Sequence, residues 1–126
     1  MNMGRNKKSM TLARKSYRKL EDVVGCKWSV SVLTAVAAGI NRPGALERNI
    51  NGISTKVLSE RLRKLTEYAL LSKHVYAEVP PRTEYALTRS GQRLVDIITQ
   101  INQLDDDIRH AEQAAPAQTP KRGRSA

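Results

Sequence analysis

Apolar residues recur every three or four positions along most of the chain, which is the period of an amphipathic helix. This pattern predicts a first helix over residues 11–24 and a second helix that begins near Trp28 and ends at Gly39. A third, shorter helix is expected from Pro43, a residue favoured at the first helical position, to about Ile50. In the second helix, the residues expected to face the core are Trp28, Val32, Leu33, Val36 and Ala37.

The clearest helical pattern follows Ser54, which is a favourable N-cap residue. The pattern predicts a helix over residues 54–66, with a narrow apolar stripe formed by Leu58, Leu62, Leu65 and Ala69. The opposite side of this helix is polar and net positive. Its members are Thr55, Lys56, Ser59, Glu60 and Arg63, with Lys64 at its flank.

Two alternating segments come next, over residues 71–79 and 83–88, and Pro80-Pro81-Arg82 separates them. Alternation with period two is typical of strands, and proline is tolerated in loops but not in a central strand. The sequence therefore predicts a two-stranded hairpin whose exposed, stiff tip ends at Arg82.

Thr88 is expected to cap a long final helix. Its apolar residues follow one another at alternating steps of three and four, which is a heptad seam. The seam consists of Leu94, Ile97, Ile101, Leu104 and Ile108. A seam of this length favours helix pairing between two chains, although packing within one chain is the alternative.

The charge of the chain is concentrated at its ends. The 126 residues carry 22 Lys and Arg against 12 Asp and Glu, a net charge of +10. Residues 1–20 contain basic side chains and no acidic one, and the last residues are also basic. We therefore expect a flexible basic arm (1–10), a folded domain (11–112) and a disordered basic tail (113–126) that favour a polyanionic partner. The alternative is that the ends only aid solubility.

Several classes of protein are disfavoured by what the sequence lacks. One cysteine cannot form an internal disulfide, and neither a metal-ligand set nor a cofactor-binding fingerprint is recognisable. There is also no evident nucleophile and base pair, so we expect neither an enzyme nor a bound cofactor or metal. With no apolar segment long enough to span a bilayer, the expected location is the cytoplasm.

Cys26 carries the one candidate for sensing chemistry. It lies beside Lys27 at the start of a helix, and a helix N-terminus and a nearby ammonium both favour the oxidisable thiolate. The alternative is that Cys26 is a small buried filler.

Short motifs along the chain resemble those of the HxlR family of bacterial transcription regulators, which are related to the MarR group. They are Gly25-Cys26-Lys27-Trp28, Arg42, Gly52-Ile53-Ser54, the run from Val75 to Thr88, and Gly91. The resemblance covers about residues 20–100. It departs from the family at Cys26, where a glycine is usual, at Pro43, where an aromatic is usual, and in having no cysteine before the first helix.

This resemblance implies an α+β, mainly α fold: a winged helix-turn-helix with a two-stranded wing and N- and C-terminal dimerisation helices. Helix 54–66 would enter the major groove of double-stranded DNA, and the wing (71–88) would lie on the flanking backbone or minor groove. The expected DNA-binding residues are Ser54, Thr55, Lys56, Ser59, Glu60, Arg63, Lys64, Lys73, Arg82, Arg42, Arg5, Lys7 and Lys8. The expected dimer interface consists of Leu12, Leu20, Leu94, Ile97, Ile101, Leu104 and Ile108.

The function that follows is a homodimeric, sequence-specific regulator, most simply a repressor, that reads a (pseudo)palindromic operator. Two alternatives remain open. A nonspecific or architectural nucleic-acid-binding protein would bind unrelated duplexes equally, and a winged-helix protein-interaction module would keep its function after charge reversal at Lys56 and Arg63. Neither the operator nor any small-molecule or redox effector can be read from the sequence.

Overall fold

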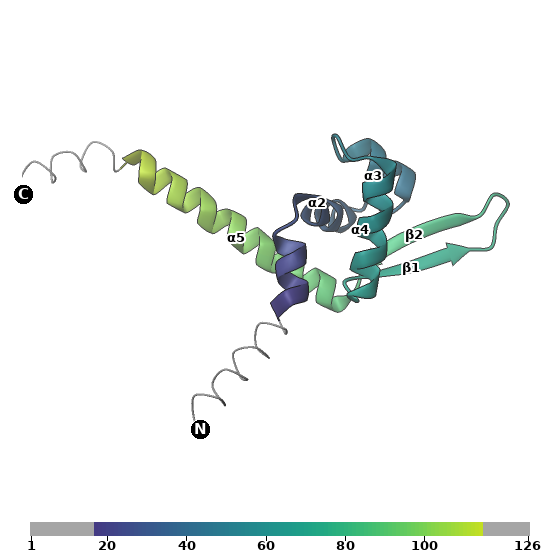
Figure 1. The fold of residues 1–126 in the computed structure, drawn as a ribbon. Helices are drawn as coiled ribbons and strands as arrows, with labels where there is room; N and C mark the ends of the chain where they lie inside the picture. The colour runs from purple at the N-terminus through teal and green to yellow at the C-terminus, as the bar shows by residue number, and fades with distance from the viewer. Residues whose placement is uncertain (1–16, 115–126) are drawn as a thin grey trace, which may run out of the picture. The chain divides into compact units, whose positions relative to one another are not determined.

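The computed structural model describes residues 17–114, and residues 17–24 form its first helix. The elements that follow are α2 (Lys27–Ala37), α3 (Pro43–Asn49), α4 (Thr55–Glu67), β1 (Leu71–Tyr76), β2 (Arg82–Leu87) and α5 (Arg89–Ala114) (Figure 1). The two strands form one antiparallel sheet. This mainly helical arrangement with a two-stranded wing is the winged helix-turn-helix that the sequence predicted.

Parts of the expected organisation lie outside the described residues. They include the whole basic arm with Arg5, Lys7 and Lys8, the interface residue Leu12, and residues 115–126 of the tail. The start of the expected tail, residues 113 and 114, belongs to α5.

An aliphatic core joins α2, α3, α4 and the start of β1. Its most deeply buried members are Val32, Leu33, Leu46, Leu65 and Leu71. In α2 the expected inward face was partly wrong. Trp28 is only half-buried and Ala37 is exposed, whereas the polar Ser29 is buried. Trp28 and Ala37 lie at the two edges of the buried face, because residues 29, 32, 33 and 36 define its centre.

The limits of α4 follow from local hydrogen bonding. The Ser54 hydroxyl oxygen accepts a 3.1 Å hydrogen bond from the Val57 amide, which confirms the predicted N-cap. The expected apolar stripe is correct at its three leucines and wrong at Ala69. That residue follows the helix, is exposed and has a φ of 62°, a left-handed conformation that ends the helix. Leu70 is buried in its place.

The wing is shorter than the alternation predicted. Its register runs from Leu71 opposite Leu87 to Tyr76 opposite Arg82, so residues 77–81 lie outside the ladder. Pro80 and Pro81 have no amide hydrogen to donate to a ladder, which accounts for the early end. A 2.8 Å hydrogen bond from the Tyr85 amide to the Asn41 carbonyl oxygen ties β2 to the loop before α3.

Thr88 joins the wing to α5 as the predicted cap. Its hydroxyl accepts a 3.0 Å hydrogen bond from the Gly91 amide and donates a 2.6 Å bond to the Ala69 carbonyl oxygen. Leu94, expected in a dimer seam, is 4% exposed in the single chain and belongs to the core. The exposed part of the expected seam therefore begins at Ile97 rather than at Leu94.

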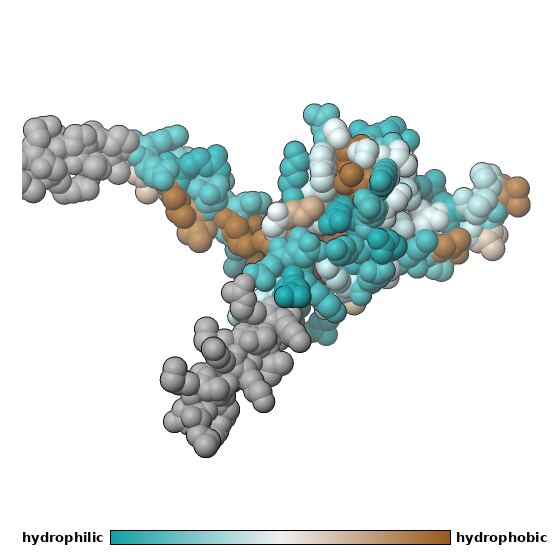
Figure 2. Space-filling view, in the orientation of Figure 1, coloured by the Kyte–Doolittle hydropathy of each residue, from teal (hydrophilic) through white to brown (hydrophobic). Residues whose placement is uncertain are grey.

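The chain divides into two compact units, and the boundary between them follows Val95. The described part of the second unit, residues 96–114, consists of α5 alone. Four large apolar side chains of residues 96–114 are exposed: Ile97, Ile101, Leu104 and Ile108. Figure 2 shows brown, hydrophobic atoms along one side of α5. Ile98, which the heptad did not include, is buried.

Candidate nucleic-acid interface

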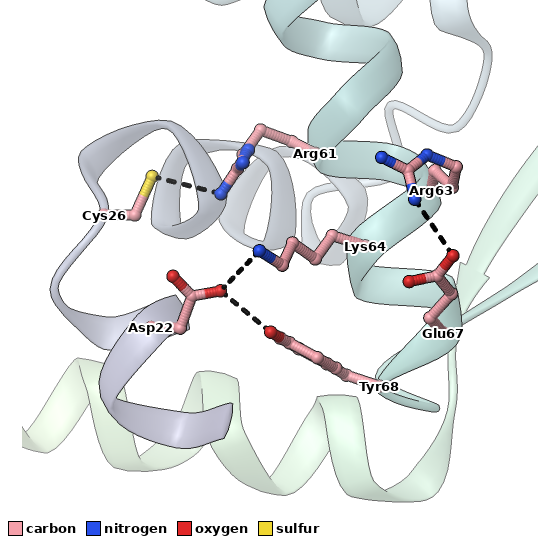
Figure 3. Close-up of polar contacts among 7 residues, drawn as sticks. All are labelled: Asp22, Cys26, Arg61, Arg63, Lys64, Glu67 and Tyr68. Atoms are coloured by element: carbon pink, nitrogen blue, oxygen red, sulfur yellow. Dashed lines mark hydrogen bonds and ion pairs between the residues drawn. The ribbon is translucent and has the colours of Figure 1, made fainter. Parts of the chain in front are cut away.

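The exposed side of α4 presents the polar face that the sequence predicted. Thr55, Lys56, Ser59, Glu60 and Arg63 are all exposed. The Thr55 hydroxyl donates a 2.7 Å hydrogen bond to Glu47, and Arg63 forms a 3.0 Å ion pair with Glu67 one turn further on (Figure 3). Within the described part of the chain, no partner engages Lys56, Ser59 or Glu60. These three side chains can therefore meet a ligand without breaking an existing contact.

Ser54 and Lys64, two further expected DNA-binding residues, also have structural partners. The Ser54 hydroxyl caps the helix, as described above. Lys64 lies on the side of α4 that faces residues 17–24, where its ammonium approaches a carboxylate oxygen of Asp22 at 3.5 Å (Figure 3). Lys64 therefore contributes to the packing of the first helix rather than to the exposed polar face.

Asp22 also accepts a 2.9 Å hydrogen bond from the Tyr68 hydroxyl. That bond, opposed by partial burial and assisted by the Lys64 charge, lowers the pKa of Asp22 below its ordinary value. Burial, together with the bond to the Asp22 carboxylate, raises the pKa of Tyr68. At neutral pH the carboxylate is thus ionised and the phenol protonated, the states in which this hydrogen bond forms.

Arg82 does not extend from the wing tip as expected. Its guanidinium lies 3.9 Å from the centre of the Tyr76 ring and forms ion pairs with Glu78 and Glu84 at 3.3 and 3.5 Å. Arg42, another expected DNA-binding residue, approaches the same Glu84 carboxylate at 3.6 Å. These contacts occupy Arg82 and hold the wing to the start of α3.

The wing tip therefore has a different chemistry from the one predicted. Residues 77–81 contain no lysine or arginine, and Val79 is fully exposed. Figure 2 shows hydrophobic atoms at the end of the wing. The exposed cation of the wing is Lys73, in the middle of β1.

A groove between α4 and the wing brings Lys73 near the polar face of α4. From α4 it is lined by Ser59, Leu62, Arg63, Thr66 and Glu67, from the wing by Lys73 and Tyr85, and from α3 by Pro43. The groove thus joins the two elements that the sequence assigned separately to DNA. Tyr85 and Thr66 were not expected there, because alternation gives the face of a strand but not the helix that it approaches.

Cys26 is the N-cap residue of α2 and is half-buried. Burial opposes ionisation, but hydrogen bonds from Ser29 and the Trp28 amide, with the charge of Arg61, outweigh it and lower the pKa of the Cys26 thiol. The Arg61 guanidinium lies 3.8 Å from the sulfur (Figure 3). The sequence suggested Lys27 for this role, and that was wrong. The Lys27 ammonium lies 4.6 Å from the centre of the Trp28 ring.

Among residues 17–114, no group of three or more His, Cys, Asp or Glu side chains could hold a metal ion. None of the helices described is long and apolar enough to cross a membrane.

Comparison with known families decides the classification. The model of the HxlR-like helix-turn-helix family matches residues 23–113, which include α2 to α4, the wing and nearly all of α5. The chain belongs to the HxlR-like family. This confirms the resemblance seen in the sequence motifs, and the departures at Cys26 and Pro43 lie within the matched segment.

Individual relatives of this HxlR-like chain carry names of one kind. It is 37% identical over 86 residues to a protein of Synechocystis named as an HTH-type transcriptional regulator, and the match covers 68% of this chain and 64% of the relative. The chain thus spans somewhat less than two thirds of that relative's length. That relative is described as a transcriptional regulator and not as an enzyme.

Solved structures give the same classification. A MarR-family transcriptional regulator from Enterococcus faecalis aligns with a TM-score of 0.72 at 28% identity, covering 80% of this chain and 92% of the other. The redox regulator HypR in its oxidised form aligns with a TM-score of 0.63 at 30% identity, covering 70% and 91%. The fold of this HxlR-like chain is therefore that of MarR-type regulators.

Proposed function

We propose that this HxlR-like protein is a dimeric, sequence-specific DNA-binding regulator of transcription. The observation that carries the proposal is the exposed polar face of α4, which lies beside a two-stranded wing and retains unengaged Lys56, Ser59 and Glu60. The names of its relatives support the same reading. A repressor is the simplest form, because a small domain can act by occupying an operator. Its place of action is then the compartment that holds the DNA, the cytoplasm.

In the proposed complex, α4 enters the major groove. Lys56 or Arg63 pairs with guanine O6 and N7, Glu60 accepts from cytosine N4, and Thr55 and Ser59 meet phosphate or either base. Lys73 on the wing contacts the flanking backbone. The arm residues Arg5, Lys7 and Lys8 extend the footprint and add to the salt dependence of binding. Arg42 and Arg82 shape the wing rather than read the operator.

The proposed dimer forms through the exposed apolar residues of α5, joined by Leu20 of the first helix, which is 41% exposed. A twofold dimer presents two copies of α4 and reads a (pseudo)palindrome with half-site centres about 34 Å apart. Leu94 leaves this interface, since it already packs within its own chain.

Fluorescence anisotropy tests the proposal with duplexes selected from a random pool and scrambled duplexes of equal length. We expect a preference of roughly a thousandfold at physiological salt. Lys56→Ala should weaken binding to the selected duplex. Arg109→Ala is the matched control, because it removes an equal charge from α5, where Arg109 contacts Asp105 and Asp106.

The other outcomes identify the alternatives. Equal binding to selected and scrambled duplexes would favour a nonspecific or architectural nucleic-acid-binding protein, in which the basic ends supply affinity without sequence preference. No binding to any duplex would refute the proposal and leave a protein-interaction module.

A further inference from the structure

The groove between α4 and the wing contains a buried tyrosine whose hydroxyl has no partner among residues 17–114. Tyr85 is 8% exposed, and none of the described residues forms a hydrogen bond with its hydroxyl. Among the described residues, the Tyr85 oxygen is not one of the fully buried side-chain atoms that lack a hydrogen bond, so solvent reaches it. Burial raises the pKa of Tyr85, which keeps the hydroxyl protonated and able to donate at neutral pH.

Other donors line the same groove. Lys73 is the cross-strand partner of Tyr85, and the two lie on the same side of the wing. Ser59 and Arg63 face them from α4, across a volume of about 420 Å³. Glu67 is the groove's acidic group, and it is paired with one terminal nitrogen of Arg63. The remaining guanidinium N–H groups of Arg63 are left for another acceptor. The charged side chains of the groove therefore sum to one positive charge.

The position of the groove indicates its ligand. One sugar-phosphate strand separates the major groove of a duplex from the neighbouring minor groove. A helix in the major groove and a wing on the minor groove must therefore lie on opposite sides of that strand. The groove between α4 and the wing is where the strand has to cross.

We propose that this groove clamps a single phosphate of the DNA backbone, with the Tyr85 hydroxyl, the Ser59 hydroxyl and the Lys73 ammonium as donors. The proposal rests on the DNA-binding function argued above and adds Tyr85 to it. Because phosphate carries no sequence information, the clamp fixes the position of α4 in the major groove without selecting bases.

Tyr85→Phe in the full chain is the direct test, because it removes the hydroxyl and keeps the ring. We expect roughly tenfold weaker binding to selected and scrambled duplexes alike. The slope of log K against log salt should be unchanged, because no charge is lost. Lys73→Gln should weaken binding and also reduce that slope by about 0.9. Tyr76→Phe is the matched control, since Tyr76 lies in the same wing outside the groove.

A scan with neutral methylphosphonates, one per duplex, then locates the phosphate. At one position per half-site, the methylphosphonate should weaken binding by the wild type. The same methylphosphonate should weaken binding by Tyr85→Phe much less, because that variant has already lost its contact to this phosphate. Ser59→Ala provides a second variant at an exposed site, in case Tyr85→Phe impairs folding.

The clamp is refuted if Tyr85→Phe and Ser59→Ala both bind every duplex as the wild type does. It is also refuted if these variants lose affinity for inorganic phosphate alone and not for DNA. A wild-type protein that binds no duplex would instead refute the underlying DNA-binding proposal, so the two failures are distinguishable.

Discussion

The hydroxyl of Tyr68 donates a 2.9 Å hydrogen bond to the same carboxylate oxygen of Asp22 that Lys64 approaches at 3.5 Å. The bond joins residues 46 positions apart. It fixes the helix of residues 17–24 against the end of α4, the element on which the proposed function depends. The first helix is thus held by polar contacts as well as by the buried Val23.

Asp22→Asn should destabilise the fold in a pH-dependent way. Because the pKa of Asp22 is lower in the folded chain than its ordinary 3.8, its ionised form stabilises the fold above that pH, and the contribution is lost as the pH falls through the folded value. At pH 7 we expect the variant's free energy of unfolding to be about 1 kcal/mol lower or less, since both partners are partly exposed.

Urea unfolding followed by circular dichroism at neutral and acid pH measures this effect. The stability difference between wild type and variant should shrink below about pH 4. Asp107→Asn, a change of the same charge on exposed α5, is the control and should cost less at neutral pH. A difference that stays constant with pH would contradict the assignment.

Alkylation of Cys26 should begin at lower pH than that of an ordinary thiol. The thiolate is the reactive form, and its hydrogen bonds and Arg61 lower the pKa despite burial. Arg61→Ala should move the pH profile of iodoacetamide reactivity upward. Lys27→Ala should move it less, because the Lys27 ammonium lies over Trp28. Identical profiles for wild type and Arg61→Ala would assign the lowered pKa to the hydrogen bonds from Ser29 and Trp28.

Cys26 is also the candidate redox sensor of the sequence analysis, and an oxidant tests that role. If Cys26 senses oxidants, diamide should weaken DNA binding by the wild type and leave Cys26→Ser unaffected. A Cys26→Ser variant that responds to diamide as the wild type does would leave Cys26 as a packing residue.

Gly91→Ala should be strongly destabilising. A Cβ at this position would overlap the carbonyl oxygen of Leu70, a backbone atom that cannot turn away. We expect a loss of about 3 kcal/mol in the free energy of unfolding. Gly44→Ala in α3 is the control, because its nearest neighbour is the flexible end of Arg48 at 3.4 Å. There, helix propensity favours alanine by about 1 kcal/mol. Equal unfolding midpoints for the two variants would show that the backbone moves aside at Gly91.

Leu104→Asp should convert the proposed dimer to a monomer without unfolding it. Leu104 is 59% exposed in the single chain, so the charge costs little within one chain but is buried in an interface. Light scattering after size-exclusion chromatography at micromolar concentration gives the mass. Gln103→Asp, an exposed neighbour off the seam, should leave the mass unchanged. A monomeric wild type would refute the dimer itself.

Local signals in the sequence were sufficient for the order of the elements. Ser54 and Thr88 cap their helices as predicted, because a cap depends on one hydroxyl and the amide three residues later. The leucines of α4 are buried as their spacing required. The polar side of the same helix is exposed for the same geometric reason. The motifs of the wing were sufficient for the family.

What the sequence could not supply is the partner that a side chain meets on a distant element. Lys64 and Arg82 are basic residues at exposed-looking positions, and the sequence assigned both to DNA. In the structure, Lys64 forms an ion pair with Asp22. Arg82 contacts the Tyr76 ring and the carboxylates of Glu78 and Glu84. Periodicity reports the face of an element, but not which side chain of another element comes within hydrogen-bonding distance.

The sequence by itself determined the helices, the hairpin, the polar face of α4 and the family, because hydrophobic period, caps and motifs act over a few residues. Tertiary structure alone decided that Arg61 rather than Lys27 lies beside Cys26, that Leu94 is core, and that Tyr85 opens onto the groove between α4 and the wing. Those relationships join residues far apart in the chain, and only packing brings them together.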